Sequence, residues 1–315
     1  MRKLVTIVVP VYNEAENVWL LQEAVQQVFE QLPQYHHQII FVDDGSSDDT
    51  LIALRQMAER FTAVRYLSFS RNFGHQFALK AGLDYADGDC VISMDGDMQH
   101  PPELIPAMLE GWEQGNDVVY TIREEDKQLP YGKRQSSKLF YNLLNNLSDI
   151  ELEEGSADFR LLSSQVVSII RNLKEYDIFF RGMVKWMGFS QMAIRYQPAE
   201  RKHGASKYTF KKMVRLALQG ITSFSTKPLY IATYLGFFFS AASILILPYV
   251  LYSFYFGHPN SGWASVIIAI AFFGGLQLMI LGIIGIYLGK LFMQAKQRPQ
   301  YIIKESNLHG QKGSI

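Results

Sequence analysis

Short apolar runs alternate with amphipathic segments over the first 125 residues. The strand-like runs are Leu4–Val11, Gln38–Asp43, Val64–Ser68, Cys90–Met94 and Asp117–Thr121. The segments with helical spacing are Ala15–Gln31, Thr50–Arg60, Gly74–Tyr85 and a region near Pro102–Gln114. Short buried strands separated by helices are typical of βαβ units. The pattern therefore predicts an α/β fold, with a Rossmann-like, mostly parallel sheet and helices on both faces.

The segments that follow each predicted strand are the best candidates for chemistry. Ligands of open parallel sheets bind beyond the carboxyl ends of the strands. In this chain those segments are Tyr12–Glu14, Asp43–Asp49, Ser70–His75, Asp95–His100 and Ile122–Arg134.

Residues 122–209 have a less regular pattern. We expect helices over Ser136–Leu147 and Ser163–Asn172 and a strand over Gln191–Gln197. The stretch around Asp158–Arg160 is mixed and predicts no single element.

Two long apolar segments follow, Leu229–Phe256 and Trp263–Leu288. Each exceeds the roughly 20 residues that cross a bilayer. No Lys, Arg, Asp or Glu occurs from Pro228 to Gly289, which argues against two buried core helices. The linker between them has no Lys or Arg, whereas both flanks are basic. The positive-inside rule therefore predicts two transmembrane helices in an inner (plasma) membrane, with the catalytic domain and both termini in the cytoplasm.

Apolar residues at helical spacing also mark Phe210–Ser225, with basic residues on the opposite face. This pattern favours a helix lying in the membrane interface, although an amphipathic helix packed on the domain stays open. We expect a catalytic domain over 1–209, the interfacial helix over 210–227, a two-helix anchor over 228–290 and a cytoplasmic tail over 291–315.

Charge and cysteine content narrow the function classes. The 315 residues include 30 basic and 30 acidic side chains, so bulk charge gives no case for nucleic-acid binding. The single cysteine, Cys90, excludes an internal disulfide and has no cysteine partner for a zinc site. The N-terminus lacks the pattern of a signal peptide.

Two acidic clusters follow predicted strands. Asp95 and Asp97 flank a glycine, and two carboxylates so placed can chelate a hard divalent cation that neutralises a leaving diphosphate. The segment Asp43–Thr50 supplies four carboxylates where a helix cap needs one acceptor. One of these carboxylates could accept a hydrogen bond from a nucleotide base.

Five sequence blocks occur together in one order. They are VVPVYNEAENV from Val8, DDGSSDDT from Asp43, SRNFGHQFALKAG from Ser70, DGDMQHPPE from Asp95 and RKHGASKY from Arg201. In order and spacing they resemble the inverting family 2 glycosyltransferases of GT-A fold, in the dolichyl-phosphate mannose synthase-like branch. The paired apolar segments make the chain most similar to the bacterial bactoprenol glucosyltransferases.

The resemblance implies a role for each matching residue. Donor nucleotide-sugar binding falls to Pro10, Tyr12, Glu14, Asp43, Asp95 and Arg201. By the same resemblance, Asp97 and Gln99 bind a divalent cation, Mg²⁺ or Mn²⁺. Phosphate and acceptor binding falls to Arg123, Arg134, Ser206 and Lys207. Asp158 is the family's candidate base, and Asp97 and Asp158 are the candidate catalytic residues. We expect His75 and His100 to have a structural role, or a supporting role behind the binding residues, and not to act as general bases.

The chemistry of the acceptor leaves the role of Asp158 open. A phosphate monoester has a second pKa of about 6 and arrives largely as a dianion, so it needs no base. Asp158 can therefore act as a base or only position the acceptor.

The sequence thus predicts transfer of a sugar, with glucose from UDP-glucose as the leading hypothesis, to undecaprenyl or another polyprenyl phosphate. GDP-mannose, UDP-N-acetylglucosamine and an aminoarabinose donor stay open, as does the oligomeric state, including a homo-oligomer. Other expected partners are membrane lipids, and no nucleic acid. A processive polysaccharide synthase and a nucleotide-regulated transporter are weaker alternatives, because the first usually has a Gln-x-x-Arg-Trp motif and the second needs intramembrane ionisable groups.

Overall fold

The structure is a computed structural model that describes residues 2–124, 147–148, 153, 155–176, 178–197, 220–256 and 262–308. The helix expected over Ser136–Leu147 and most of the one expected over Phe210–Ser225 lie outside the described residues. The chain divides into two compact units. The first comprises Met1–Asn142, Ile150–Phe210 and Pro299–Ile315, and the second comprises Leu143–Asp149 and Lys211–Arg298.

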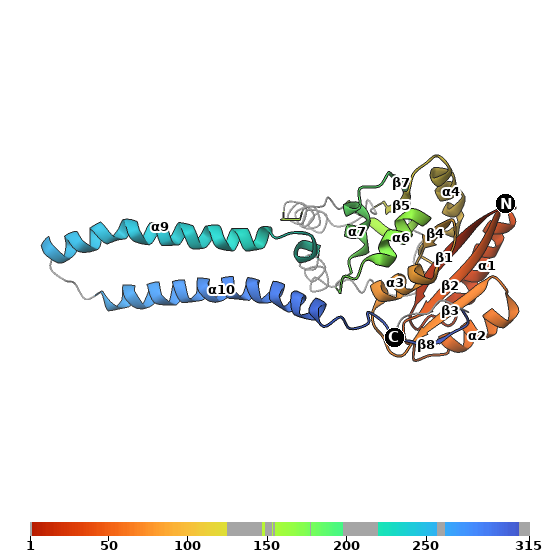
Figure 1. Cartoon of the computed structure of the whole chain (residues 1–315), viewed down its shortest axis with the longest axis horizontal. Coiled ribbons are helices and arrows are strands. Elements are labelled where there is room, and N and C mark those ends of the chain that lie inside the picture. The colour runs from red at the N-terminus through yellow and green to blue at the C-terminus, as the bar shows by residue number, and fades with distance from the viewer. Residues whose placement is uncertain are drawn as a thin grey trace. The chain divides into compact units, whose positions relative to one another are not determined.

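An eight-stranded sheet forms the centre of the first unit (Figure 1). Its strand order is β7-β5-β6-β4-β1-β2-β3-β8. The strands are β1 (Lys3–Val11), β2 (Tyr35–Asp43), β3 (Val64–Phe69), β4 (Cys90–Ser93), β5 (Val118–Arg123), β6 (Ser156–Ser163), β7 (Gln191–Tyr196) and β8 (Ile303–Ser306). Strands β1 to β4 pair in parallel, as do β5 and β7. The predicted mostly parallel α/β sheet is therefore confirmed.

Helices cover both faces of this sheet. They are α1 (Asn17–Glu30), α2 (Thr50–Arg60), α3 (His75–Tyr85), η1 (Pro102–Leu104), α4 (Ile105–Glu113), α6 (Ser164–Asn172) and α7 (Phe180–Trp186). Alternate β1 residues, Val5 to Val11, join one buried cluster with apolar residues of α1, α2 and α4. On the other face Val8 lies so close to Gly82 of α3 that a Cβ there would meet its Cγ1 at 2.1 Å. The core thus holds the carboxyl ends of the central strands in fixed register.

Two antiparallel strands complete the sheet, and the sequence pattern predicted neither. Strand β6, which contains the stretch around Asp158–Arg160 for which the sequence predicted no single element, lies between β4 and β5. Strand β8 comes from the predicted tail and pairs with β3 at the sheet edge, as Figure 1 shows at the blue end of the chain. Because β6 runs opposite to β4, its first residues lie at the same edge as the carboxyl ends of the parallel strands.

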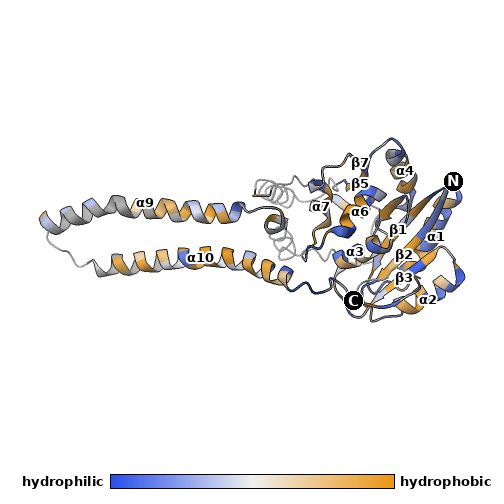
Figure 2. Cartoon of the chain, in the orientation of Figure 1, coloured by the Kyte–Doolittle hydropathy of each residue, from blue (hydrophilic) through white to orange (hydrophobic). Residues whose placement is uncertain are grey.

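The second unit contains two long helices, α9 (Lys227–Phe256) and α10 (Trp263–Ala295). Within it, the Tyr287 hydroxyl donates to the Ser225 carbonyl (2.7 Å) and Lys290 Nζ donates to Ser223 Oγ (3.1 Å). Figure 2 shows apolar residues along most of α10. Among the described residues, the helical stretch long and apolar enough to cross a membrane is Phe272–Ala295. The two membrane spans therefore stay a prediction.

Candidate active site

A cavity of about 340 Å³ opens at the carboxyl edge of the sheet. It is lined by Pro10, Val11, Tyr12, Glu14, Asp44, His75, Asp95, Gly96, Asp97 and Asp158. These residues come from the ends of β1, β2 and β4, the start of α3 and the start of β6. Five of them are carboxylates, so the cavity suits a ligand that brings cations or donates hydrogen bonds.

The end of β1 is fixed to the turn after β2. Asn13 has a φ of 57°, and its backbone N–H donates to Ser46 Oγ (2.9 Å). The Glu14 backbone N–H donates to Thr50 Oγ1 (2.9 Å), and Asn17 donates to the Glu14 carboxylate (2.5 Å). Glu14 is therefore held in place, while the Tyr12 ring is 46% exposed beside it.

The two aspartates at the end of β2 have different surroundings. Asp43 is buried and accepts from the Ser46 N–H (2.9 Å) and the Ser68 hydroxyl (2.7 Å). Asp44 lines the cavity and accepts from the backbone N–H groups of Phe73 (2.7 Å) and Gly74 (2.9 Å). Burial raises the pKa of Asp44, and these two hydrogen bonds oppose that shift. Asp44, and not the predicted Asp43, thus faces the space a ligand would occupy.

The loop after β4 has a tightly constrained backbone. A Cβ at Gly96 would lie 2.7 Å from Val11 Cγ1, so glycine allows the loop to approach β1. The backbone N–H of Asp95 donates to Nδ1 of the buried His100 (3.0 Å). Nδ1 is therefore an acceptor, and burial lowers the pKa of His100, which favours the neutral ring. His100 thus has the structural role that the sequence predicted.

Asp97 and Gln99 are on the same loop, on either side of Met98, whose φ is 59°. The Gln99 backbone N–H donates to Asp97 Oδ1 (3.1 Å), and Arg123 Nη2 donates to Gln99 Oε1 (3.0 Å). Arg123 at the end of β5 is therefore joined to the acidic loop.

Asp158 at the start of β6 is a buried carboxylate paired with Arg181 of α7. Arg181 Nε and Nη2 donate to its two oxygens at 2.9 and 3.0 Å, and Arg160 Nη2 lies 3.6 Å away. Burial acts to raise the pKa of Asp158, but the charge and hydrogen bonds of Arg181, followed by the charge of Arg160, hold it well below its usual range. Such a carboxylate is a weak proton acceptor.

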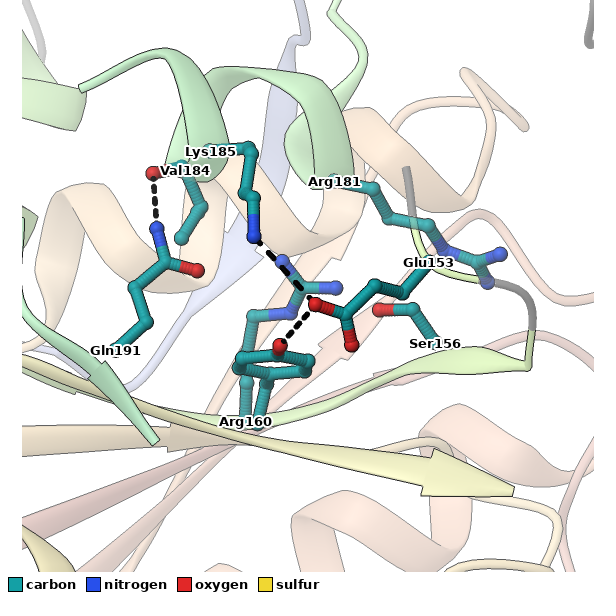
Figure 3. Close-up of a pocket in the computed structure, with 8 residues that line it drawn as sticks. Glu153, Ser156, Arg160, Arg181, Val184, Lys185 and Gln191 are labelled. Carbon is teal, nitrogen blue, oxygen red and sulfur yellow. Dashed lines mark hydrogen bonds and ion pairs between the residues drawn. The ribbon is translucent and has the colours of Figure 1, made fainter. Parts of the chain in front are cut away.

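A second, water-sized cavity of about 20 Å³ lies beside this pair (Figure 3). In it the Glu153 carboxylate accepts from the Tyr120 hydroxyl (2.9 Å) and lies 3.6 Å from Lys185 Nζ. Arg181 and Lys185, four residues apart on α7, thus face two different carboxylates. The buried Arg160 lines this space, and its Nε has no hydrogen-bond partner among the described residues.

The structure brings most of the predicted site together. Pro10, Tyr12, Glu14, Asp95, Asp97 and Asp158 line the large cavity, and Gln99 and Arg123 are linked to its acidic loop. Asp43 does not line it. Arg134, Arg201, Ser206 and Lys207 lie outside the described residues.

Sequence reasoning missed three residues of this region. Asp44 belongs to the predicted acidic cluster, but the sequence indicates no role of its own for it, and it predicts for His75 only a structural role or a supporting role behind the binding residues. In the structure His75 lines the cavity, with Nε2 3.4 Å from Asp95 Oδ1. Arg181 lay in an aromatic-rich stretch, and no local signal linked it to Asp158.

Comparison with known sequences shows the family of this chain. The profile of Glycosyl transferase family 2 matches residues 6–169, which is more than half of the chain. The chain belongs to glycosyl transferase family 2. This family 2 chain is 41% identical over 302 residues to a Bacillus subtilis protein named uncharacterized glycosyltransferase YkcC, covering 96% of this chain and 93% of that protein.

Two further likenesses agree with the family. The chain is 40% identical over 304 residues to the SfII prophage-derived bactoprenol glucosyl transferase of Shigella flexneri, covering 96% of this chain and 98% of that one. The solved mannosyltransferase PcManGT from Pyrobaculum calidifontis, in complex with GDP-Man and Mn²⁺, superposes with a TM-score of 0.51. It shares 14% identity and is matched over 94% of this chain and 87% of that one, so it supports the fold alone. The predicted family and GT-A fold are confirmed.

Proposed function

We propose that this protein is a membrane-anchored, inverting glycosyltransferase that moves a sugar from a nucleoside diphosphate sugar to a polyprenyl phosphate. The observation that carries the proposal is the acidic cavity at the carboxyl ends of β1, β2 and β4, with Asp158 on its wall. The names of relatives near 40% identity over almost the full chain support a bactoprenol acceptor and a glucosyl donor.

The donor is assigned to the β1 and β4 side of the cavity. Pro10, Tyr12 and Glu14 supply a partly exposed aromatic ring and a fixed carboxylate, which suit a nucleoside. Asp95 lines the same cavity, on the loop fixed by His100. We assign Asp43 to the turn that holds this pocket together, and Asp44 to its surface.

A divalent cation, Mg²⁺ or Mn²⁺, fits the donor set around Asp97. Among the described residues, no group of three or more His, Cys, Asp or Glu side chains forms a complete metal site. Asp97 and Gln99 offer oxygen atoms, and Mg²⁺ commonly binds through one or two carboxylates together with substrate phosphates. When bound, the cation would neutralise charge on the leaving diphosphate. Arg123 positions Gln99 for this role.

Transfer takes place by a single displacement. A phosphate oxygen of the acceptor attacks the anomeric carbon of the sugar, and the bond from that carbon to the diphosphate oxygen breaks. The acceptor dianion needs no base, and the pair with Arg181 makes Asp158 a poor one. We therefore assign Asp158 a positioning role. One displacement inverts the anomeric configuration.

The acceptor lies in a membrane, which gives the second unit its role. Helices α9 and α10 are proposed to span the inner membrane, with both termini and the catalytic unit in the cytoplasm. The acceptor or donor phosphate is proposed to bind to Arg134, Arg201, Ser206 and Lys207. The Arg and Lys side chains supply the cations that are needed to bring two anions together.

The test is a transfer assay with a panel of donors. Purified full-length protein is incubated with undecaprenyl phosphate, Mg²⁺ or Mn²⁺, and UDP-glucose, GDP-mannose, UDP-N-acetylglucosamine or an aminoarabinose donor. We expect one hexosyl lipid product by mass, formed best from UDP-glucose, with a β linkage by NMR from an α-linked donor. An α-linked product would contradict inversion, and a long polymer would favour the processive synthase.

A further inference from the structure

The segment 300–308, here named the tail strap, follows α10 and is part of the catalytic sheet. Its strand β8 pairs antiparallel with β3, with Ser306 opposite Leu67 and Glu305 opposite Ser68. The Ser70 backbone N–H donates to the Ile302 carbonyl (3.0 Å). The strap therefore covers the edge strand of the sheet and reaches the first residue of the loop after β3.

Side chains fasten the strap at its strand. Arg55 Nε of α2 donates to Glu305 Oε1 (2.7 Å), and the Tyr66 hydroxyl donates to the same oxygen (2.7 Å). The Tyr66 backbone N–H donates to Asn307 Oδ1 (2.7 Å). The Arg55 ion pair is partly exposed and contributes little alone, but it acts together with a hydroxyl and a backbone donor at one place.

A second fastening lies before the strand. The Tyr301 hydroxyl donates to Asp84 Oδ2 (2.9 Å), and Asp84 also pairs with the buried Lys80 of α3. The Tyr301 ring stacks on Phe69 with centroids 5.2 Å apart, and Phe69 contacts Phe73 edge-on at 5.6 Å. A continuous row of rings thus runs from the strap into the loop after β3.

The end of β3 and the loop after it orient the two aspartates at the end of β2. The Phe73 and Gly74 backbone N–H groups donate to Asp44, and His75 follows them into the cavity. Ser68, which pairs with Glu305 of the strap, donates its hydroxyl to Asp43 (2.7 Å). The strap therefore pairs directly with Ser68, which holds Asp43, and reaches Phe73, which holds Asp44, through the ring of Phe69.

We propose that the tail strap is a positioning element for the donor site, and that Tyr301 and Glu305 fix Asp43 and Asp44 through Ser68 and the loop Ser70–Gly74. This inference rests on the proposed use of the cavity for a nucleoside diphosphate sugar. Neither strap residue lines the cavity, so they act only through Ser68 and this loop.

The test compares full-length variants with a control on the same strand. Tyr301→Ala removes both the bond to Asp84 and the ring stacked on Phe69, Glu305→Gln removes the charge, and the double variant combines them. Lys304→Gln, on an exposed residue between them, is the matched control. The readouts are hydrogen exchange of the Phe73 and Gly74 amides, affinity for UDP and GDP, and the donor and acceptor KM.

In the double variant we expect faster exchange at these two amides, with unchanged exchange at core amides of β1. Nucleoside diphosphate affinity should fall about tenfold, and donor KM should rise in parallel while acceptor KM stays constant. Lys304→Gln should match the unaltered protein.

Two outcomes would overturn the proposal. Unchanged exchange and affinity in the double variant would show that the strap does not act on the donor site. Faster exchange throughout β1 would show that it stabilises the whole sheet. If the unaltered protein transfers no sugar to a polyprenyl phosphate, the proposed function fails, while amide exchange and nucleotide affinity still decide the role of the strap.

Discussion

Asn13 and Met98, two residues at the cavity, have a positive φ without being glycine. This conformation costs roughly 1–2 kcal/mol for an ordinary residue and persists where surrounding contacts impose it. Hydrogen bonds to Ser46 and Ser47 impose it at Asn13. At Met98 the strain places Asp97 and Gln99 together, at the position proposed for the metal.

Asp97→Asn should therefore reduce transfer by roughly 100-fold or more, because an amide binds a hard cation more weakly than a carboxylate. The Asp97 side chain is exposed, and its hydrogen bond with the Gln99 backbone is local, so the melting temperature should stay constant. The measurement is turnover against Mn²⁺ concentration. Glu103→Gln, an exposed acidic residue outside the cavity, is the control, and near-normal turnover of Asp97→Asn at any Mn²⁺ concentration would remove the metal assignment.

Arg181→Met should change the pH dependence of transfer. With Arg181 present, the pKa of Asp158 lies below its unfolded value of about 3.9, so the pair stabilises the fold above that pH and loses this contribution as the pH falls. Without Arg181, burial dominates and the pKa of Asp158 rises. The acidic limb of kcat/KM should then move up by about one pH unit or more.

The matched control is Lys185→Met, because Lys185 is on the same helix but pairs with Glu153. It should leave the acidic limb in place. Arg181→Lys should move the acidic limb less than Arg181→Met does, since it keeps the charge and loses the paired geometry. An acidic limb that is identical in Arg181→Met would show that Asp158 does not need Arg181 to stay ionised.

At the scale of elements, the site depends on loops that pack against one another at the strand ends. The turn after β2 has Gly45 with a φ of +69°, and a Cβ there would lie 2.4 Å from the Arg71 carbonyl carbon. The β2 turn therefore touches the backbone of the loop after β3, which in turn holds Asp44. A change in one loop must displace the other.

Gly45→Ala should lower both stability and donor affinity. Gly115→Ala is the control, because Gly115 also has a positive φ (+96°) but nothing lies within 4 Å of its Cβ position. The control should cost about 1–2 kcal/mol of folding free energy from backbone strain alone. Gly45→Ala should cost more and raise the donor KM, as measured by thermal unfolding and kinetics. Equal effects of the two substitutions would show that the Gly45–Arg71 contact is unimportant.

At the scale of the whole molecule, the chain joins a catalytic unit to a unit of two long helices and then returns to the catalytic sheet as β8. Because β8 is part of the catalytic sheet, the proposed topology requires the strap to be on the same side of the membrane as the catalytic unit. The single native cysteine suits a labelling test, because Cys90 is buried and burial raises the pKa of its thiol.

In intact cells, Asn260→Cys should react with a membrane-impermeant maleimide, because it lies in the linker between the two apolar segments. Lys304→Cys, on the exposed side of the strap, should react only after permeabilisation. The native protein should give no signal in either case. Labelling of Lys304→Cys from outside intact cells would contradict the topology.

The sequence by itself determined the α/β class, the positions of the first five strands along the chain, the family and the acidic segments of the cavity. Short stretches of sequence suffice to predict these features, because side-chain burial follows the period of each element and parallel strands bring their ends to one edge. Asp95 and Asp97 were found for this reason.

Only the tertiary structure decided which of these side chains face the cavity and what charges oppose them. Asp43 and Asp44 are adjacent in sequence and both are buried, but only Asp44 lines the cavity, where the loop after β3 donates to it. Asp158 meets Arg181 from a different element, and Glu305 meets Arg55 across 250 residues. No local period encodes such pairs, because a polar side chain acquires its partner only when the core fixes the elements that carry them.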